Sequence, residues 1–148
     1  MVMDFIVKDL DYNYRLDAFR NKADKIIFEI SSEISTANCP YCGKESKRIH
    51  SIYQREIQDL PIQGKKVVLL VLTRKFFCDN DMCCKRTFSE RHTFVDANGK
   101  KTKRLEKNIL FTSSQLSSIN ASKVLKNSNV DISKSSICVL LKKNAIDC

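Results

Sequence analysis

The sequence predicts an α+β chain in two parts, a β-rich domain over residues 1–96 and a small helical domain over residues 97–148. Three observations support this division. Hydrophobic and polar residues alternate through much of the first part, whereas from about residue 97 the hydrophobic residues recur at three- and four-residue intervals. In addition, two short cysteine pairs in the first part could be drawn together by a single metal ion.

Two antiparallel hairpins are predicted in the first domain. The first joins an extended stretch from Tyr14 to Arg20 to another from Lys25 to Thr36, through a turn at residues 21–24. In the second hairpin, residues 47–57 and 66–77 pair across a turn formed by Leu60-Pro61-Ile62-Gln63-Gly64. The second stretch of the first hairpin places four apolar residues on one alternating face: Ile26, Phe28, Ile30 and Ile34.

The cysteine pairs flank the second hairpin and predict a zinc-ribbon-like domain. Cys39-Pro-Tyr-Cys42 precedes it and is followed by Gly43, which lets backbone amides turn towards the sulfurs, while Cys78 and Cys83 follow it. Four thiolates satisfy a tetrahedral zinc ion and close its coordination shell, so we expect one structural Zn²⁺ and no zinc-bound water for hydrolysis. The modest apolar content makes such a metal useful for holding the domain together.

Alternatives to these four ligands remain open at this stage. Cys84 could replace its neighbour Cys83, and His50 could complete the shell if one sulfur were not available. Cys138 and Cys148 are expected to be non-ligands. Disulfide pairing is a further alternative, although seven cysteines leave no complete set of pairs and a cytoplasmic chain favours metal binding.

Charge is distributed unevenly along the chain, whose formal net charge is +9. Residues 1–38 carry five basic and seven acidic residues, residues 39–96 carry eleven and seven, and residues 97–148 carry ten and three. A basic C-terminal third suits a polyanion, because cations near phosphates release condensed counterions. Solvated lysine-rich helix faces are the alternative interpretation.

Three amphipathic helices are predicted after a possible hinge at Asn98-Gly99. The last has a clear start, because the hydroxyl of Ser133 can cap its first turn. Such a trio suits a helix-turn-helix, in which the N-terminal residues of the second helix of the motif meet base edges, and a plain helical bundle is the alternative. The apolar faces of the three helices contain Leu105, Ile109 and Leu110, then Ile119, Val124 and Leu125, then Ile137, Leu140 and Leu141.

Candidate DNA contacts come from the last helix, the basic cluster before the first helix and the second cysteine pair. Lys85 and Arg86 beside the cysteines could instead offset the negative charge of a zinc–thiolate centre. Phe76, Phe77 and Phe88 are expected to pack around the cysteine loops, and Asp59, Asp79 and Asp81 to form turns or local charge pairs. The candidate contacts are Lys85, Arg86, Lys103, Arg104, Lys134, Ser135, Ser136, Lys142 and Lys143.

An ordered series of motifs resembles the N-terminal region of one branch of bacterial insertion-sequence transposases. The resemblance covers about residues 25–143 and is strongest from 39 to 91. It implies a zinc-binding domain and a helix-turn-helix domain that recognise the terminal repeats of the element. The motifs are Cys39-Pro-Tyr-Cys42-Gly43, His50-Ser51-x-Tyr53-x-Arg55, Asp59-Leu60-Pro61-x-x-Gly64, Arg74-Lys75-Phe76-Phe77-Cys78, and Cys83-x-Lys85-Arg86-x-Phe88-x-Glu90-Arg91.

In that branch the two domains precede a DDE-type catalytic domain, whose three carboxylates hold two metal ions, and this sequence contains no counterpart of it. We therefore expect a non-enzymatic, cytoplasmic DNA-binding module whose partners are double-stranded terminal-repeat DNA and either a second copy or a full-length transposase. No run of residues is apolar enough to predict a membrane span. The alternative function is a zinc-ribbon module that binds proteins and has only non-specific affinity for polyanions.

Overall fold

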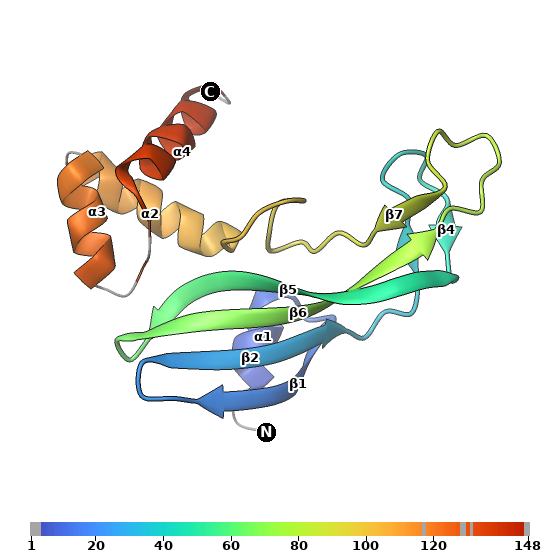
Figure 1. Ribbon diagram of the computed structural model, residues 1–148, viewed down its shortest axis with the longest axis horizontal. Coiled ribbons are helices and arrows are strands. Elements are labelled where there is room, and N and C mark those ends of the chain that lie inside the picture. Colours follow the sequence, from blue (N-terminus) through green and yellow to red (C-terminus); the bar gives the residue numbers. More distant parts are fainter. Residues whose placement is uncertain (1–3, 117, 128–129, 131, 147–148) are drawn as a thin grey trace.

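The structure, a computed structural model, describes residues 4–116, 118–127, 130 and 132–146, without the side chains of residues 118 and 143–146. A five-stranded mixed sheet and a small two-stranded sheet are followed by three helices (Figure 1). The elements are α1 (Asp4–Leu10), β1 (Tyr14–Asn21), β2 (Lys25–Ser32), β3 (Ala37–Asn38), β4 (Glu45–Ser46), β5 (Ile49–Ile62), β6 (Lys65–Phe77), β7 (Thr87–Ser89), α2 (Lys103–Gln115), α3 (Ser118–Asn127) and α4 (Lys134–Ile146).

Both predicted hairpins are present, but the sheet that unites them is not purely antiparallel. Strands β1 and β2 pair antiparallel, as do β5 and β6, whereas β2 and β6 run parallel with Phe28 opposite Leu69. The spatial order is β1-β2-β6-β5, with β7 pairing beside the end of β6. A purely antiparallel domain was therefore the wrong expectation, because the two hairpins associate through their second strands.

The predicted boundaries of two strands also differ from the structure. Strand β2 ends at Ser32, and Ile34 is 46% exposed, so this residue does not extend the buried face of Ile26, Phe28 and Ile30. Strand β5 continues through Pro61, and the turn is reduced to Gln63 and Gly64, both at positive φ. Proline is tolerated there because β5 lies at the edge of the sheet.

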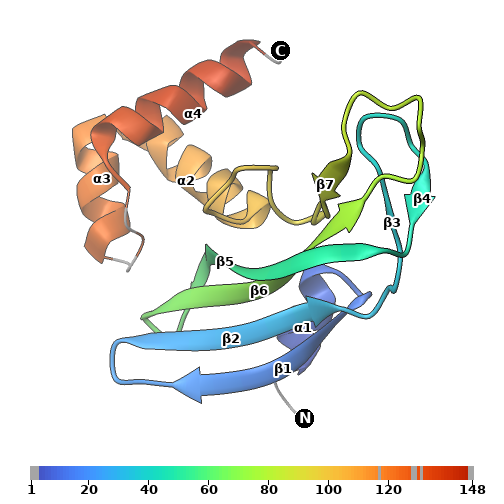
Figure 2. The same cartoon turned by 45° about the vertical axis from the view of Figure 1, so that its right-hand side comes forward.

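The main hydrophobic core lies on one face of the sheet, where helix α1 crosses it (Figures 1 and 2). Val7 of α1 packs there with inward-facing residues of β2, β5 and β6, and the segment that contains Phe94 and Val95 covers the remainder. This seven-residue helix was not predicted. Its burial links the N-terminal segment to the strands that carry the cysteine loops.

The three C-terminal helices form a second core, as their hydrophobic spacing predicts, but three residues of the predicted apolar faces are exposed: Ile119, Val124 and Leu141. Helix α4 begins after Ser133, whose Oγ accepts a hydrogen bond from the backbone N–H of Ser136 at 3.2 Å, confirming the predicted cap. Leu60 of β5 packs against this core, so the sheet and the helices share a contact. The buried residues are Leu105, Ile109, Ala121, Leu125, Val130 and Ile137.

Within the described ranges, every helix is too short or too polar to cross a membrane.

Candidate metal centre and basic surface

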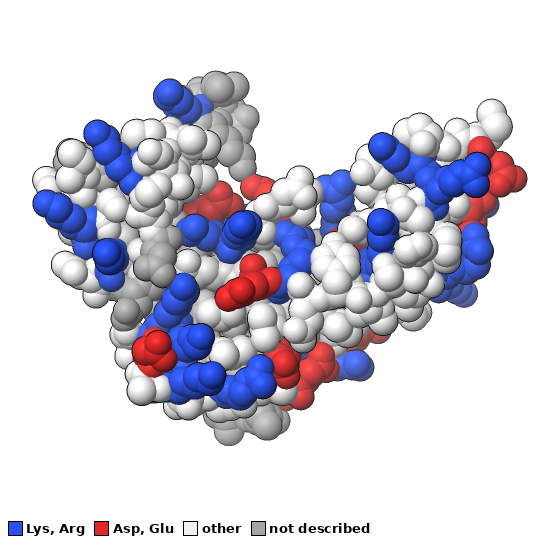
Figure 3. Space-filling model, in the orientation of Figure 1, with Lys and Arg blue, Asp and Glu red and all other residues white. Residues whose placement is uncertain are grey.

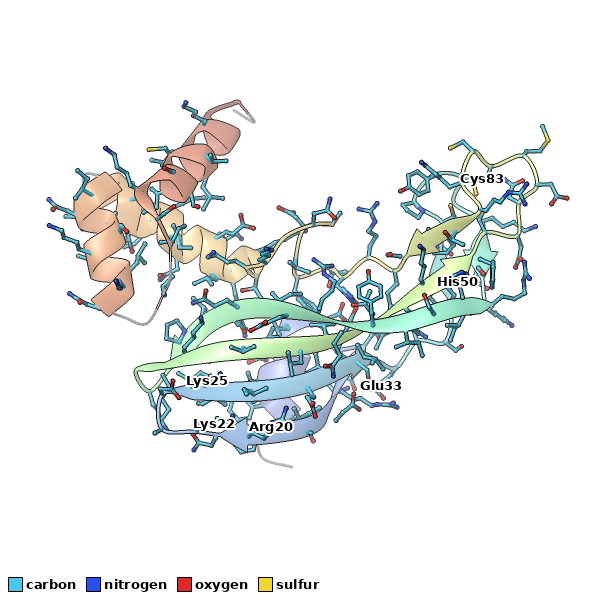
Figure 4. All side chains as sticks on the ribbon, in the orientation of Figure 1. Arg20, Lys22, Lys25, Glu33, His50 and Cys83 are labelled. Carbon is cyan, nitrogen blue, oxygen red and sulfur yellow. The ribbon has the colours of Figure 1, made fainter. Side chains whose placement is uncertain are left out.

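Strand pairing brings the two cysteine pairs to the end of the sheet opposite the C-terminal helices (Figure 1). Cys39 directly follows β3, and Cys78 directly follows β6. The hairpin of β5 and β6 spans the sequence between the pairs and returns the chain to its starting point. Figure 4 shows Cys83 in the loop at this end, with His50 on the neighbouring strand β5.

Backbone hydrogen bonds fold each cysteine pair into a tight loop. The N–H of Gly43 donates to the carbonyl of Cys39 at 2.7 Å, and Gly43 adopts a φ of 81° that L side chains disfavour. In the second loop, the N–H of Cys78 donates to the carbonyl of Arg86, while the N–H of Cys83 donates to that of Asn80. Both loops therefore direct their sulfurs towards one point.

The four sulfur atoms of Cys39, Cys42, Cys78 and Cys83 all lie within 4.8 Å of one another. The Sγ atoms of Cys39 and Cys83 are 3.8 Å apart, and those of Cys42 and Cys78 are 3.5 Å apart. A tetrahedral Zn²⁺ with Zn–S bonds of about 2.3 Å requires sulfur separations of about 3.8 Å. The separations are far too long for disulfides, and the cluster fits one structural Zn²⁺.

The chemistry of the thiols favours a cation between them. A hydrogen bond from the backbone of Lys44, together with the side chain of Asn80, lowers the pKa of Cys42 to about 6. The backbone of Asn80 also lowers the pKa of Cys78, but burial and the neighbouring Cys42 outweigh it, so the net shift is upward. Ionisation of one thiol thus disfavours ionisation of the neighbouring thiol. A divalent cation bound between the sulfurs stabilises all of the thiolates together.

Two aromatic side chains pack against the cysteine cluster. Phe76 and Phe88 stack with ring centroids 5.6 Å apart and form a small core with the buried Cys39. The hydroxyl of Ser46 donates to the carbonyl of Phe77 at 2.5 Å and joins β4 to the end of β6. Phe76 and Phe88 therefore pack as the sequence predicts. Phe77 is half-buried, and the guanidinium of Arg48 lies 4.9 Å from its ring centroid.

The two alternative ligands lie outside the cluster. His50 is exposed, shares a hydrogen bond of 3.1 Å with Ser51, and contacts the ring of Phe77 edge-on. Cys84 is exposed, and its sulfur is not among the four grouped atoms. Cys138 is half-buried in α4, far along the chain, whereas Cys148 lies outside the described residues.

The acidic residues expected to form turns or local charge pairs have different surroundings. Asp79 beside the cysteine loop pairs with Arg48, as a local charge partner would. Asp59 is instead buried in β5, where it accepts hydrogen bonds from Thr102 and Arg104. The sequence interpretation also missed His92, which is buried between the hydroxyls of Tyr14 and Thr73. No local sequence signal identifies either residue, because their partners are distant in sequence.

Basic side chains are spread from the cysteine end to the helices on the face shown in Figure 3. Lys85 and Arg86 are exposed beside the cysteine loop, and the Nζ of Lys85 lies 5.9 Å from the ring centroid of Tyr41. Four candidate contacts are exposed around the helices: Lys103, Lys134, Ser135 and Ser136. Lys142 is exposed too, but the side chain of Lys143 lies outside the described residues. Arg104 differs from these because Asp59 already binds its guanidinium.

Ser135 and Ser136 line a cleft of about 510 Å³ between the first half of α4 and the segment before α2. Lys100 and Lys101 border the opposite side of this cleft, and Val139 provides part of its apolar wall. Asp96 and Glu106 also line the cleft, so its charge is mixed. The predicted DNA-contacting end of α4 thus lies close to the segment that connects the sheet to the helices.

Comparison with known families agrees with the cysteine geometry. Residues 35–87 match the family described as the zinc-finger of transposase IS204/IS1001/IS1096/IS1165, an ISL3-type zinc ribbon. The match includes all four clustered cysteines and the hairpin between them, and it ends before the helices. No curated protein and no solved structure matches the chain.

Proposed function

Since residues 35–87 are the zinc ribbon of an ISL3-family transposase, we propose that this chain is a zinc-dependent DNA-binding module that recognises the terminal repeats of an insertion sequence. Cys39, Cys42, Cys78 and Cys83 hold the zinc in this proposal. Residues 1–96 form the zinc-binding domain, and residues 97–148 form a helix-turn-helix domain. The partner is double-stranded DNA, bound by one copy, by a homodimer or together with a full-length transposase.

One observation carries the DNA-reading part of this proposal: α4 begins with a capped, exposed polar turn in an otherwise basic helical unit. Lys134, Ser135 and Ser136 follow the capping residue and are all exposed. These short donors and acceptors suit base edges at the N-terminal end of a recognition helix. Lys142 and Lys143 near the other end of α4 suit the flanking phosphates.

The remaining cations would contribute affinity with little sequence preference. Lys103 at the start of α2 is exposed, and Lys85 and Arg86 at the zinc end would reach the same DNA backbone. We leave Arg104 out of this set, because its guanidinium is bound to the buried carboxylate of Asp59. Arg104 is assigned a positioning role instead.

The connection between α3 and α4 supports a helix-turn-helix although it is longer than a standard turn. The N–H of Val130 donates to the carbonyl of Leu125 at 2.7 Å, and the hydroxyl of Ser122 donates to the carbonyl of Ile132 at 2.7 Å. These bonds hold the described part of the connection against α3. Helices α2, α3 and α4 share one core, as the three helices of such a domain do.

The experiment that tests this function starts from the zinc-loaded chain and a library of random-sequence DNA duplexes. Repeated selection should enrich one sequence, bound about a thousandfold more tightly than unselected duplex at physiological salt. Lys134→Ala and Ser135→Ala should reduce that preference, whereas Lys103→Ala should weaken binding to all sequences alike. Lys22→Ala is the matched control, since Figure 4 shows Lys22 at the β1–β2 turn, well away from the helices.

The alternative function predicts a different result from the same experiment. A zinc-ribbon module that binds proteins would enrich no sequence, and its DNA affinity would depend on salt alone. We also propose that this chain binds DNA without cutting it. A supercoiled plasmid that carries the selected sequence should remain intact with Mg²⁺ or Mn²⁺, and metal-dependent nicking would overturn that part of the proposal.

A further inference from the structure

The segment that connects the sheet to the helices, residues 96–102, is bound along the outer edge of β5. The guanidinium of Arg55 donates to the carbonyls of Asp96 at 3.1 Å and Gly99 at 2.8 Å. Three residues further along β5, the backbone of Gln58 pairs with the segment on both sides, accepting from Thr102 at 2.9 Å and donating to Lys100 at 2.8 Å. The connection therefore forms an isolated parallel bridge to β5, between Gln58 and Lys101.

The contacts continue into the first turn of α2. The carboxylate of Asp59 accepts a hydrogen bond of 2.7 Å from the hydroxyl of Thr102 and one of 2.8 Å from Nε of Arg104. Asp59 is 1% exposed and Thr102 is fully buried, so water does not compete for these bonds. We call Arg55, Gln58 and Asp59 the β5 clamp.

Tight packing replaces the hinge that the sequence suggests at Asn98-Gly99. The N–H of Gly99 donates to the carbonyl of Asp96, which closes a turn. A Cβ placed on Gly99 would lie 3.1 Å from a methyl carbon of Val95, so the chain has little free space there. Leu60 adds an apolar contact between β5 and the core of the helices.

We propose that Arg55 and Asp59 are positioning residues that hold the zinc ribbon and the helices together as one rigid DNA-binding unit. This inference rests on the proposed function, and it adds that the DNA site has two contact regions at a fixed spacing. The clamp places Lys100 and Lys101 across a cleft from Ser135 and Ser136, so a shift of the segment would move these cations relative to α4. A flexible tether would instead allow variable spacing.

Rigidity is tested first without DNA, by backbone amide relaxation of the zinc-loaded chain. Amides of the sheet and of α2–α4 should share one rotational correlation time. In the double variant Arg55→Gln/Asp59→Asn, the helices should tumble measurably faster than the sheet, with zinc content unchanged. Two correlation times in the unmodified chain, or one in the double variant, would overturn the inference.

Two further variants separate positioning from general loss of fold. Thr102→Ser keeps the hydroxyl that donates a hydrogen bond to Asp59, so this variant should behave as the unmodified chain does. Thr102→Val lacks the hydroxyl and should resemble the double variant. Asp17→Asn removes an exposed carboxylate that pairs with Arg15 on β1 and serves as the matched control. If Asp17→Asn also separated the two correlation times, the effect would not belong to the clamp.

The DNA measurement uses the selected duplex, with five base pairs inserted between its two protected regions. Because B-DNA turns once in about 10.5 base pairs, this insertion rotates one region by about half a turn. The unmodified chain should lose about tenfold or more in affinity, whereas Arg55→Gln/Asp59→Asn should lose less than about threefold. Equal losses in both proteins would contradict the inference.

The two measurements keep the two proposals apart. If selection enriches no sequence, the proposed function fails, while the relaxation data still decide whether the clamp makes the chain rigid. If a sequence is enriched but the spacing has the same effect on both proteins, DNA recognition stands and the positioning role fails.

Discussion

Arg104 binds the carboxylate of Asp59 through both Nε and Nη2, which ties the second residue of α2 to the C-terminal part of β5. Asp59 is almost fully buried, whereas the side chain of Arg104 is about one-third exposed. The hydrogen bond from Arg104 to Asp59 raises the pKa of the guanidinium, which therefore keeps its charge. Thr102 completes the arrangement by donating to Asp59 while accepting from the N–H of Leu105 as the N-cap of α2.

Replacing Asp59 by Asn should destabilise the zinc-loaded chain by about 2 kcal/mol, because Arg104 loses its charged partner in a partly buried site. An amide cannot accept two hydrogen bonds from the guanidinium while it also accepts the one from Thr102. Urea unfolding at neutral pH measures the change. Asp17→Asn, whose carboxylate is exposed, should change stability by less than about 0.5 kcal/mol. Equal effects of the two substitutions would show that burial adds nothing to the Asp59 pair.

Replacing Cys42 by Ser should lower zinc binding and loosen the ribbon. The remaining three thiolates leave one corner of the tetrahedron to a weak hydroxyl ligand, so a chelator should remove the metal at far lower concentration. Thermal unfolding should begin about 10 °C lower or more. Cys84→Ser is the matched control, because Cys84 neighbours the cluster without joining it. Full zinc retention by Cys42→Ser, measured by elemental analysis, would argue against the four-sulfur site.

Local sequence signals predicted the hairpins, the cysteine loops and the start of α4. Alternation in β2, a turn that ends at Gly64 and a serine cap at Ser133 each act within a few residues, so the sequence reveals them directly. The cysteine pairs add one long-range constraint, since a shared metal requires the two ends of the second hairpin to meet. The zinc end could therefore be predicted in some detail.

The parts that could not be predicted depend on contacts between distant segments. The parallel pairing of Phe28 with Leu69 cannot be predicted from the sequence of either strand, because both residues have the pattern of ordinary buried strand positions. Helix α1 is only seven residues long, too short for a helical period to stand out. Asp59 precedes Leu60-Pro61, a sequence typical of a turn, so its burial was not predicted. The buried carboxylate is explained by the hydrogen bonds that it accepts from Thr102 and Arg104.

The β5–β6 turn offers a direct test of backbone conformation. Gln63 and Gly64 have φ values of 51° and 73°, which is the pattern of a two-residue type I′ turn. Asn tolerates this region better than Gln, so Gln63→Asn should stabilise the chain by about 0.5 kcal/mol. Gly64→Ala should cost about 1 kcal/mol, and because its Cβ would meet nothing within 4 Å, that cost comes from the backbone alone. Urea unfolding that showed no loss in Gly64→Ala would contradict the turn type.

The buried imidazole of His92 should make the fold less stable in mild acid. Burial lowers the pKa of His92 from 6.5 to about 4, against a smaller upward influence of the Glu90 carboxylate. Between these values the unfolded chain binds a proton that the folded chain does not, so stability falls as the pH drops below about 6.5. From pH 8 to pH 5 the loss from this residue should be about 2 kcal/mol.

The pH effect of His92 is separated from acid release of zinc by comparison with His92→Gln. Both proteins have the same cysteines, so protonation of the zinc ligands contributes equally to their urea unfolding curves at each pH. His92→Gln should be less stable near pH 8, because Gln cannot reproduce the contacts with both Tyr14 and Thr73. The gap between the two proteins should then narrow by about 2 kcal/mol as the pH falls to 5. A gap that stayed constant would mean that His92 takes up its proton equally readily in the folded and unfolded chains.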